Sequence, residues 1–518
     1  MRVLCYLLLA AAFSVLPASP LGPGMRFWYT LETEHFRIHY PSGQENVALR
    51  LAPLAEKTHA RLEARYRGGG KKTDVVLVFD SDLVNAFATT ANGLDQVVLY
   101  LNHPELGQFS RYDSWLELLF VHEYTHIVTT RYYDLSDLSG LFRILIGIPW
   151  NFLAPQGFIE GIAVFEESQE GKGRLKDPLT NMIARTSVLD NTFPDRGEIL
   201  TGSHRYPFGS HVYLYGGRFQ NYLAGRYGAD RLARFWRLEE FPFALDDRLR
   251  MLGMRPYRLE FADYAAGEIA DARRVLDEVT ARGVTPFRRL TEDGHSKTDL
   301  TFHQGNLFYF ASPGNARPGI FRLDPTDLEK KRLRRTPESA GFAMAGDVAV
   351  FSEPYFFSPG FYGYRNELYL EGWWDRRLLK GRSASHPALG PDGRRVYFVE
   401  RDEKERRLIA ADLTDRKITN VAVIRRVSLS GILESVAVSP DGQAIVFAER
   451  PGGQGFAHLV YCSQDLNCRI IVGGEAIKTH PRFSPDGSEI YFTSDADGIY
   501  NLYSYKISSG AVVRRTRT

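Results

Sequence analysis

The feature that most constrains the fold of this chain is a phrase that recurs through its C-terminal half. Three clear copies, at residues 386–398, 435–447 and 480–492, each join two strand-like runs by a Pro-Asp-Gly turn. Weaker copies run through 304–310 and 346–351. The turn glycines at 305, 346, 393, 442 and 487 are 41, 47, 49 and 45 residues apart. A repeat of this length, made of strand pairs, predicts the blades of a β-propeller.

These repeats resemble those of the TolB-type β-propeller, whose turns carry Ser-Pro-Asp-Gly, as at 439–442 and 484–487. We assign residues 285–518 to a TolB-like propeller of about five or six blades. Residues 511–518 look like the opening strand of another blade, so either the last strand closes the ring or the sequence is truncated. We favour truncation. No catalytic cluster is visible in this half, and we expect it to bind a protein partner or peptide across one face.

A second feature is the motif His122-Glu123-Tyr124-Thr125-His126, inside a run with helical periodicity from Ser114 to Thr130. Ser114 followed by Glu117 forms a capping-box pattern that predicts the start of a helix. Residues i and i+4 share one helix face, so both histidines can bind one metal ion, and Glu123 can reach a metal-bound water. The alternative is two surface histidines beside an unrelated glutamate. The apolar flanks argue against it, because buried polar groups need partners.

A third ligand is expected downstream, because catalytic zinc sites use three protein ligands and one open position. Residues 155–167 predict a second short amphipathic helix with Glu160 near its start. Gly161 and Ala163 beside it would allow two helices to approach closely. The alternative for Glu160 is an ordinary solvated carboxylate, which is how we interpret Glu166 and Glu167. Glu160 differs from those two in having small or apolar neighbours on both sides.

Together these residues resemble the gluzincin clan of zinc metallopeptidases, in the peptidase-MA-like group. The resemblance runs from about residue 28 to 270 and implies an α+β zincin-type domain, which we assign to 26–284. It implies that His122, His126 and Glu160 hold one Zn²⁺. It also implies an edge strand that pairs with an extended substrate, for which our candidate is 96–101. The later helix that often carries a transition-state tyrosine matches Tyr213, with Tyr215 in reserve.

The sequence departs from this pattern in places. The Gly-x-Met-Glu-Asn motif of the aminopeptidase branch is missing from 92–99, which puts an exopeptidase mode in doubt. An apolar insert at 140–154 lengthens the gap between His126 and Glu160; it forms either a wall of the cleft or core packing, and we favour packing. Asp134 and Asp137 could hydrogen-bond a ligand histidine, although solvated loop acids are the interpretation we prefer.

The N-terminus and the cysteines indicate the cellular compartment in which the protein resides. A charged start, an apolar run and small residues predict a signal peptide at 1–19; the alternative is a membrane anchor, for which the run is short. We therefore expect an exported protein, periplasmic or secreted, with no transmembrane helix after processing. Cys462 and Cys468 then fit a cross-hairpin disulfide, with two reduced thiols as the alternative. A net charge of +2 gives no case for nucleic acid.

The function that these features favour is hydrolysis of peptide bonds by a zinc-bound water, with Glu123 as general base and Tyr213 at the oxyanion. The propeller would recruit or gate the substrate. One alternative is a propeller-based binding scaffold whose peptidase-like domain is inactive. Another is a zinc hydrolase that acts on a non-peptide bond.

Overall fold

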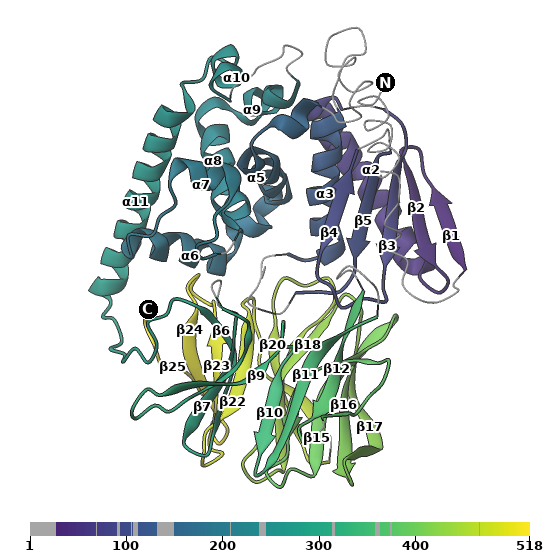
Figure 1. The fold of residues 1–518 in the computed structure, drawn as a ribbon, viewed down its shortest axis with the longest axis vertical. Coiled ribbons are helices and arrows are strands. Elements are labelled where there is room, and N and C mark those ends of the chain that lie inside the picture. Colours follow the sequence, from purple (N-terminus) through teal and green to yellow (C-terminus); the bar gives the residue numbers. More distant parts are fainter. Residues whose placement is uncertain are drawn as a thin grey trace, which may run out of the picture.

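The structure is a computed structural model that describes residues 27–68, 70–90, 94–104, 106, 112–131, 150–207, 209–237, 245–312, 316–357, 363–372, 375–465 and 467–518. The predictions for the signal peptide at 1–19, for Asp134 and Asp137, and for most of the insert at 140–154 lie outside these residues. The described chain forms an N-terminal α/β region and a C-terminal propeller, and one sits on the other (Figure 1).

The N-terminal region is built on one five-stranded sheet in the order β1-β2-β3-β5-β4. Its strands are β1 (Trp28–Glu32), β2 (Phe36–Pro41), β3 (Thr73–Val78), β4 (Ala86–Thr89) and β5 (Gln96–Tyr100). The β2, β3 and β5 strands are parallel, with helix α2 (Glu45–Tyr66) as the crossover between β2 and β3. Residues Val97 to Tyr100 of β5 are completely buried, as expected for an interior strand.

The prediction that 96–101 is the edge strand is wrong. The β5 strand lies between β3 and β4, and the edge is β4, which pairs antiparallel with β5. The sequence of β4, Ala-Phe-Ala-Thr, is short and its side chains are all half-buried, so it carries little periodic signal. The continuous apolar run of β5 instead reports burial on both faces.

Helices form the rest of the N-terminal region, on the other side of α3 from β1 and β2 (Figure 1). In chain order the α-helices are α3 (Trp115–Arg131), α5 (Gln156–Glu167), α6 (Pro178–Leu189), α7 (Arg196–Thr201), α8 (His211–Tyr227), α9 (Ala229–Arg234), α10 (Leu245–Met251) and α11 (Tyr257–Ala281). The short 3₁₀ turns are η2 (Trp150–Leu153), η3 (Gln169–Gly171), η4 (Arg174–Lys176) and η5 (Phe235–Arg237). None of the helices in the described ranges combines the length and the apolar content needed to span a bilayer.

The C-terminal part contains five antiparallel four-stranded sheets, each formed by consecutive strands, which confirms a TolB-like propeller of five blades. Blade 1 holds β6 (Ser296–His303), β7 (Asn306–Ser312), β8 (Gly319–Leu323) and β9 (Lys330–Arg335). Blade 2 holds β10 (Phe342–Ala345), β11 (Val348–Phe356), β12 (Tyr364–Leu370) and β13 (Arg376–Arg377). Blade 3 holds β14 (Ser383–Leu389), β15 (Arg395–Arg401), β16 (Glu405–Thr414) and β17 (Lys417–Ser428). Blade 4 holds β18 (Ile432–Val438), β19 (Ala444–Arg450), β20 (His458–Ser463) and β21 (Cys468–Val472). Blade 5 holds β22 (Lys478–Phe483), β23 (Glu489–Ser494), β24 (Asn501–Lys506) and β25 (Val512–Arg514).

The prediction that 511–518 opens another blade is wrong. Strand β25 pairs antiparallel with β24 and is the fourth strand of blade 5. The residues after it return to the segment that follows α11, where the backbone N–H of Thr285 donates to the carbonyl of Arg517 at 3.0 Å. The sequence of β25, Val-Val-Arg, is typical of a strand but does not specify its place in a blade.

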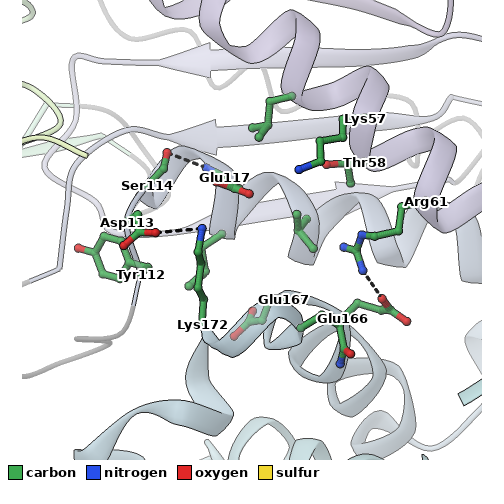
Figure 2. A pocket seen from close by; sticks show the side chains of 14 residues that line it. Lys57, Thr58, Arg61, Tyr112, Asp113, Ser114, Glu117, Glu166, Glu167 and Lys172 are labelled. Atoms are coloured by element: carbon green, nitrogen blue, oxygen red, sulfur yellow. Dashed lines mark hydrogen bonds and ion pairs between the residues drawn. The ribbon is translucent and has the colours of Figure 1, made fainter. Parts of the chain in front are cut away.

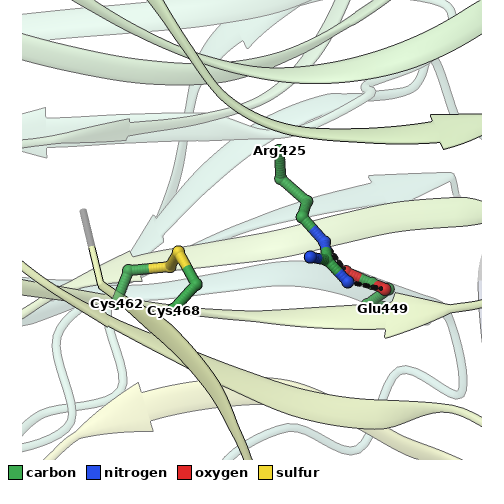
Figure 3. The surroundings of a disulfide bond; sticks show 4 residues. All are labelled: Arg425, Glu449, Cys462 and Cys468. Carbon is green, nitrogen blue, oxygen red and sulfur yellow. Dashed lines mark hydrogen bonds and ion pairs between the residues drawn. A yellow bond between two sulfur atoms is a disulfide. The ribbon is translucent and has the colours of Figure 1, made fainter.

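Cys462 and Cys468 form a disulfide across the β20–β21 hairpin, which confirms the prediction that we favoured over two free thiols (Figure 3). The two residues lie directly opposite each other in the ladder. The bridge closes a short loop, since the cysteines are 6 residues apart in sequence.

Reduction of this disulfide is expected to lower the free energy of unfolding by about 2 kcal/mol, because loop-closure entropy is modest for so short a loop. Urea denaturation with and without dithiothreitol measures the effect. The double variant C462A/C468A is the matched control and should not respond to the reductant. Equal stability of the wild-type protein in both conditions would contradict the expectation.

The two parts are joined by a buried polar interface formed by the loops after β3 and β5. Asp82 accepts hydrogen bonds from the Asn366 backbone at 2.7 Å, from the Ser383 hydroxyl at 2.6 Å and from Arg401 Nε at 2.8 Å. Further along, the backbone N–H of Leu106 donates to the Glu434 carboxylate at 2.8 Å. The loops that follow the sheet are therefore held by blades 2, 3 and 4.

Candidate metal centre

Helix α3 carries the His-Glu-x-x-His motif through the centre of the N-terminal region. The helix begins one residue later than predicted, and the backbone N–H of Glu117 donates to Ser114 Oγ at 3.3 Å, as the capping-box pattern indicates. Residues on both sides of the helix are buried, among them Phe120, Ile127 and Val128. His122 and Glu123 are only 4% and 7% exposed, so their polar groups depend on partners inside the protein.

His122, His126 and Glu160 converge from helices α3 and α5. Their ligand-type atoms form a nearly equilateral triangle, with His122 Nε2 at 3.3 Å from His126 Nε2 and Glu160 Oε2 at 3.4 and 3.3 Å from the two nitrogens. This is the group in the described part of the chain that could hold a metal ion. Glu160 Oε2 and His126 Nδ1 are buried and have no hydrogen-bond partner among the described residues.

The position of Glu160 depends on close packing between α5 and α8. A Cβ added at Gly161 would lie 2.7 Å from the backbone of Gly216, and one at Gly216 would lie 2.6 Å from the carbonyl oxygen of Gly157. Any side chain at these positions would therefore push the helices apart. The small residues noted in the sequence thus allow α8 to approach the candidate centre, and α8 carries Tyr213.

Glu167 and Arg174 lie at the Nδ1 side of the His122 ring, away from the ligand triangle. Glu167 Oε2 is 2.8 Å from His122 Nδ1, and Arg174 donates to the same carboxylate through Nε at 2.6 Å and Nη2 at 2.8 Å. Burial opposes ionisation of Glu167, but Arg174 and His122 hold its pKa below the usual range. The carboxylate can thus accept the Nδ1–H of His122 and leave Nε2 as a ligand atom.

The interpretation of Glu166 and Glu167 as solvated carboxylates is wrong, since both side chains are completely buried. Glu166 contacts Arg61 and Arg65 on α2, with the Arg61 Nη1 at 2.7 Å. Sequence reasoning missed Glu167, although its spacing of seven residues from Glu160 places both on one face of the helix. Sequence reasoning also missed Arg174, which lies in η4 and has no motif around it.

Glu123 lies beside the triangle and lines the same cavity. Burial raises the pKa of its carboxyl group, while the two histidines lower it by a smaller amount. A carboxylate with a raised pKa accepts a proton more readily near neutral pH, which suits a general base.

Of the two tyrosines considered, Tyr213 lines the cavity and Tyr215 does not. The ring of Tyr213 is 6.1 Å from that of His122, and Arg174 lies over it at 5.3 Å. Burial and the neighbouring Glu160 carboxylate raise the pKa of Tyr213, so its hydroxyl keeps its proton. Tyr215 is 1% exposed and packs in the core against Phe193.

The cavity at the triangle has a volume of about 610 Å³. Residues 84–88, which include most of β4, form one wall, and Leu179, Ile183 and Leu214 contribute apolar side chains to another. Because β4 is the last strand of the sheet among the described residues, an extended chain could add at its outer edge by backbone hydrogen bonds.

A second pocket lies on the opposite side of α3, where Arg61 of α2 reaches Glu166 of α5 (Figure 2). Its volume is about 50 Å³. That is room for one or two waters, so this pocket does not accept a polypeptide.

Fold and site together define a two-part protein, an α/β region with a His-His-Glu cluster joined to a five-bladed propeller. Residues 371–518 match the family described as TolB beta propeller domain. Among solved structures, TolB from Acinetobacter baumannii is 14% identical with a TM-score of 0.36, over 44% of this chain and 56% of that chain. A Mycobacterium tuberculosis puromycin-hydrolyzing peptidase is 12% identical with a TM-score of 0.33, over 43% of this chain and 37% of that one. These similarities concern fold and carry no conclusion about activity.

One curated relative is an uncharacterized protein of Treponema pallidum (strain Nichols). It is 31% identical over 212 residues, which are 40% of this chain and 19% of that protein. The matched part is therefore about a fifth of the relative's length.

Proposed function

We propose that the chain is an exported zinc-dependent metallopeptidase of the gluzincin type, in which His122, His126 and Glu160 hold one Zn²⁺. The observation that carries the proposal is the size of the ligand triangle, whose sides are 3.3, 3.3 and 3.4 Å. A tetrahedral zinc site with bonds of about 2.0–2.1 Å requires its ligand atoms to be about 3.3–3.4 Å apart. Glu160 Oε2 is buried and forms no hydrogen bond among the described residues, and it lies within ion-pair distance of both histidine nitrogens, which supports the same assignment.

When bound, zinc supplies a Lewis acid that polarises a carbonyl and lowers the pKa of water. The residues of the chain then have separate tasks. The outer edge of β4 binds the substrate as an extended chain. Glu123 takes up the proton of the attacking water and returns it to the leaving amine. The hydroxyl of Tyr213 donates a hydrogen bond to the oxyanion that develops at the scissile carbonyl.

The test combines metal analysis with hydrolysis of a mixed peptide library. The purified protein is expected to contain one zinc per chain, to lose hydrolysis when the metal is chelated, and to recover it when zinc is restored. If the protein binds zinc but cleaves no peptide, with or without added metal, the peptidase proposal is wrong.

Glu167→Gln is expected to weaken zinc binding by about 10- to 100-fold, because the carboxylate that orients His122 becomes a neutral amide. Competition with a chromophoric chelator measures the affinity. The neighbouring Glu166→Gln is the control, since Glu166 contacts Arg61, Arg65 and Tyr66 and none of the three proposed ligands. It should lower stability and leave zinc affinity unchanged. Equal zinc affinities in the two variants would contradict the role given to Glu167.

One observation favours the alternative of a binding scaffold with an inactive peptidase-like domain. The family match covers only propeller residues, 371–518. A scaffold would keep its partner binding after removal of zinc and would show no hydrolysis in the library assay.

A further inference from the structure

A further cavity, of about 400 Å³, lies where the propeller meets the N-terminal region. Its walls include residues 82–84 and 102–104 from the N-terminal loops, and side chains from blades 1, 2 and 3. Seven residues with hydroxyl groups line it, Ser296, Thr298, Ser312, Ser339, Tyr364, Ser383 and Ser385, and of these Ser383 already donates to Asp82. The lining is thus rich in hydrogen-bond donors, and the space is large enough for several residues of an extended chain.

Arg406 lines this cavity and forms no ion pair within the described residues, although the charges of Asp82 and Glu434 act on it. It is 8% exposed, and its Nη2 donates to the Asn102 side chain at 3.0 Å, while its Nε has no hydrogen-bond partner in the described residues. Burial and the neighbouring Arg401 lower the pKa of Arg406 to about 10. Arg401 differs, because it is paired with Asp82 at 2.7 Å. A buried guanidinium without an acid costs folding free energy unless something binds to it.

A second arginine, Arg482, adds positive charge near this cavity. The pKa of His386, which lines the cavity, is lowered to about 3 by burial and by the charges of His480, Arg406 and Arg482. The guanidinium groups of Arg406 and Arg482 therefore both act on His386. Within the described ranges, neither arginine has a carboxylate within ion-pair distance. The carboxyl group that acts on Arg482 is that of Asp299, and burial raises its pKa to about 6. The remaining acid of the lining, Glu338, is hydrogen-bonded to Tyr364.

We infer that this cavity binds a carboxylate group of an extended polypeptide, with Arg406 as the main donor and Arg482 adding charge. Arginine matches a carboxylate with two parallel hydrogen bonds, and the surrounding hydroxyls can satisfy the peptide backbone. The inference extends the proposed function, because Val84 lines both this cavity and the one at the metal centre. A chain anchored here by its carboxylate can continue along β4 to His122, His126 and Glu160.

The test uses the full chain with Glu123→Gln, so that no ligand is consumed, and calorimetric titration with three N-acetylated ten-residue peptides of alanine, serine and tyrosine. One peptide ends in a free carboxylate and one in an amide, and the third is an amide with aspartate before its last residue. The free acid is expected to bind at least about tenfold more tightly than the plain amide. The aspartate peptide shows whether a terminal or a side-chain carboxylate is preferred.

Adding Arg406→Met is expected to remove the preference for the acid without lowering the thermal midpoint, because an unpaired buried charge is lost. Arg395→Met on the same blade, whose guanidinium contacts Asp412 outside the cavity, should keep the preference. Arg482→Met is the second variant if Arg406→Met does not fold, and it should weaken the preference. Equal affinity for acid and amide, a preference unchanged by Arg406→Met, or binding of inorganic phosphate alone would each overturn the inference.

The binding readout does not require hydrolysis. A retained acid preference in a protein that holds no zinc would therefore refute only the proposed function. Zinc-dependent hydrolysis that ignores the peptide's carboxylate would refute only the carboxylate site.

Discussion

Glu123→Gln is expected to reduce peptide hydrolysis by about a thousandfold, while the zinc content stays at one ion per chain. General-base catalysis contributes roughly 10²- to 10⁴-fold, and an amide cannot accept the water's proton. The side chain is 7% exposed and adjoins the ligand triangle, so no solvent group can easily replace it. Initial rates on a peptide selected from the library, with metal analysis of the same samples, measure both quantities.

The matched control is Glu117→Gln, on the same helix but facing the small pocket on the other side of α3. It should cleave at the wild-type rate. Wild-type protein and Glu123→Gln cleaving equally would show that the hydrolysis does not depend on this carboxylate, and the proposed mechanism would fail.

The elements that the sequence predicted well are those with a strong local pattern. The Pro-Asp-Gly turns mark blades 3, 4 and 5, and the spacing of the weaker copies at Gly305 and Gly346 indicates blades 1 and 2. The His-Glu-x-x-His motif places its side chains by helical geometry, and only Glu160 requires a contact between two helices. In the structure α5, which carries that residue, packs on α8 through Gly157, Gly161 and Gly216, and of these only Gly161 was noted in the sequence as a small residue.

The features that the sequence did not predict depend on tertiary contacts. Strand β4 lies at the edge because its chain turns back beside β5, and nothing in Ala-Phe-Ala-Thr specifies that neighbour. Glu167 looks like a surface acid until Arg174, from the next turn of chain, covers it. Arg406 and Asp82 acquire their surroundings only when two parts of the chain more than 300 residues apart come together.

Arg401→Met is expected to destabilise the protein by about 3–5 kcal/mol, the largest stability effect that we expect from a single substitution. Arg401 donates to Asp82 and to the carbonyl groups of Phe79 and Ser81, and its side chain is 7% exposed against 3% for Asp82. Methionine fills much of the space but leaves the Asp82 carboxylate buried without its cation. Urea denaturation followed by tryptophan fluorescence and far-UV circular dichroism measures the loss.

The control, Arg425→Met, also replaces the arginine of an ion pair with methionine. Its partner is Glu449, and the arginine is 41% exposed (Figure 3). This control should cost less than Arg401→Met, because Arg425 is 41% exposed and donates to Glu449, whereas the buried Arg401 also donates to two backbone carbonyl groups. Since Arg401 joins blade 3 to the loop before β4, its loss should also let the N-terminal region and the propeller unfold in separate steps. A single transition shifted no further than that of Arg425→Met would mean that the buried pair does not hold the two parts together.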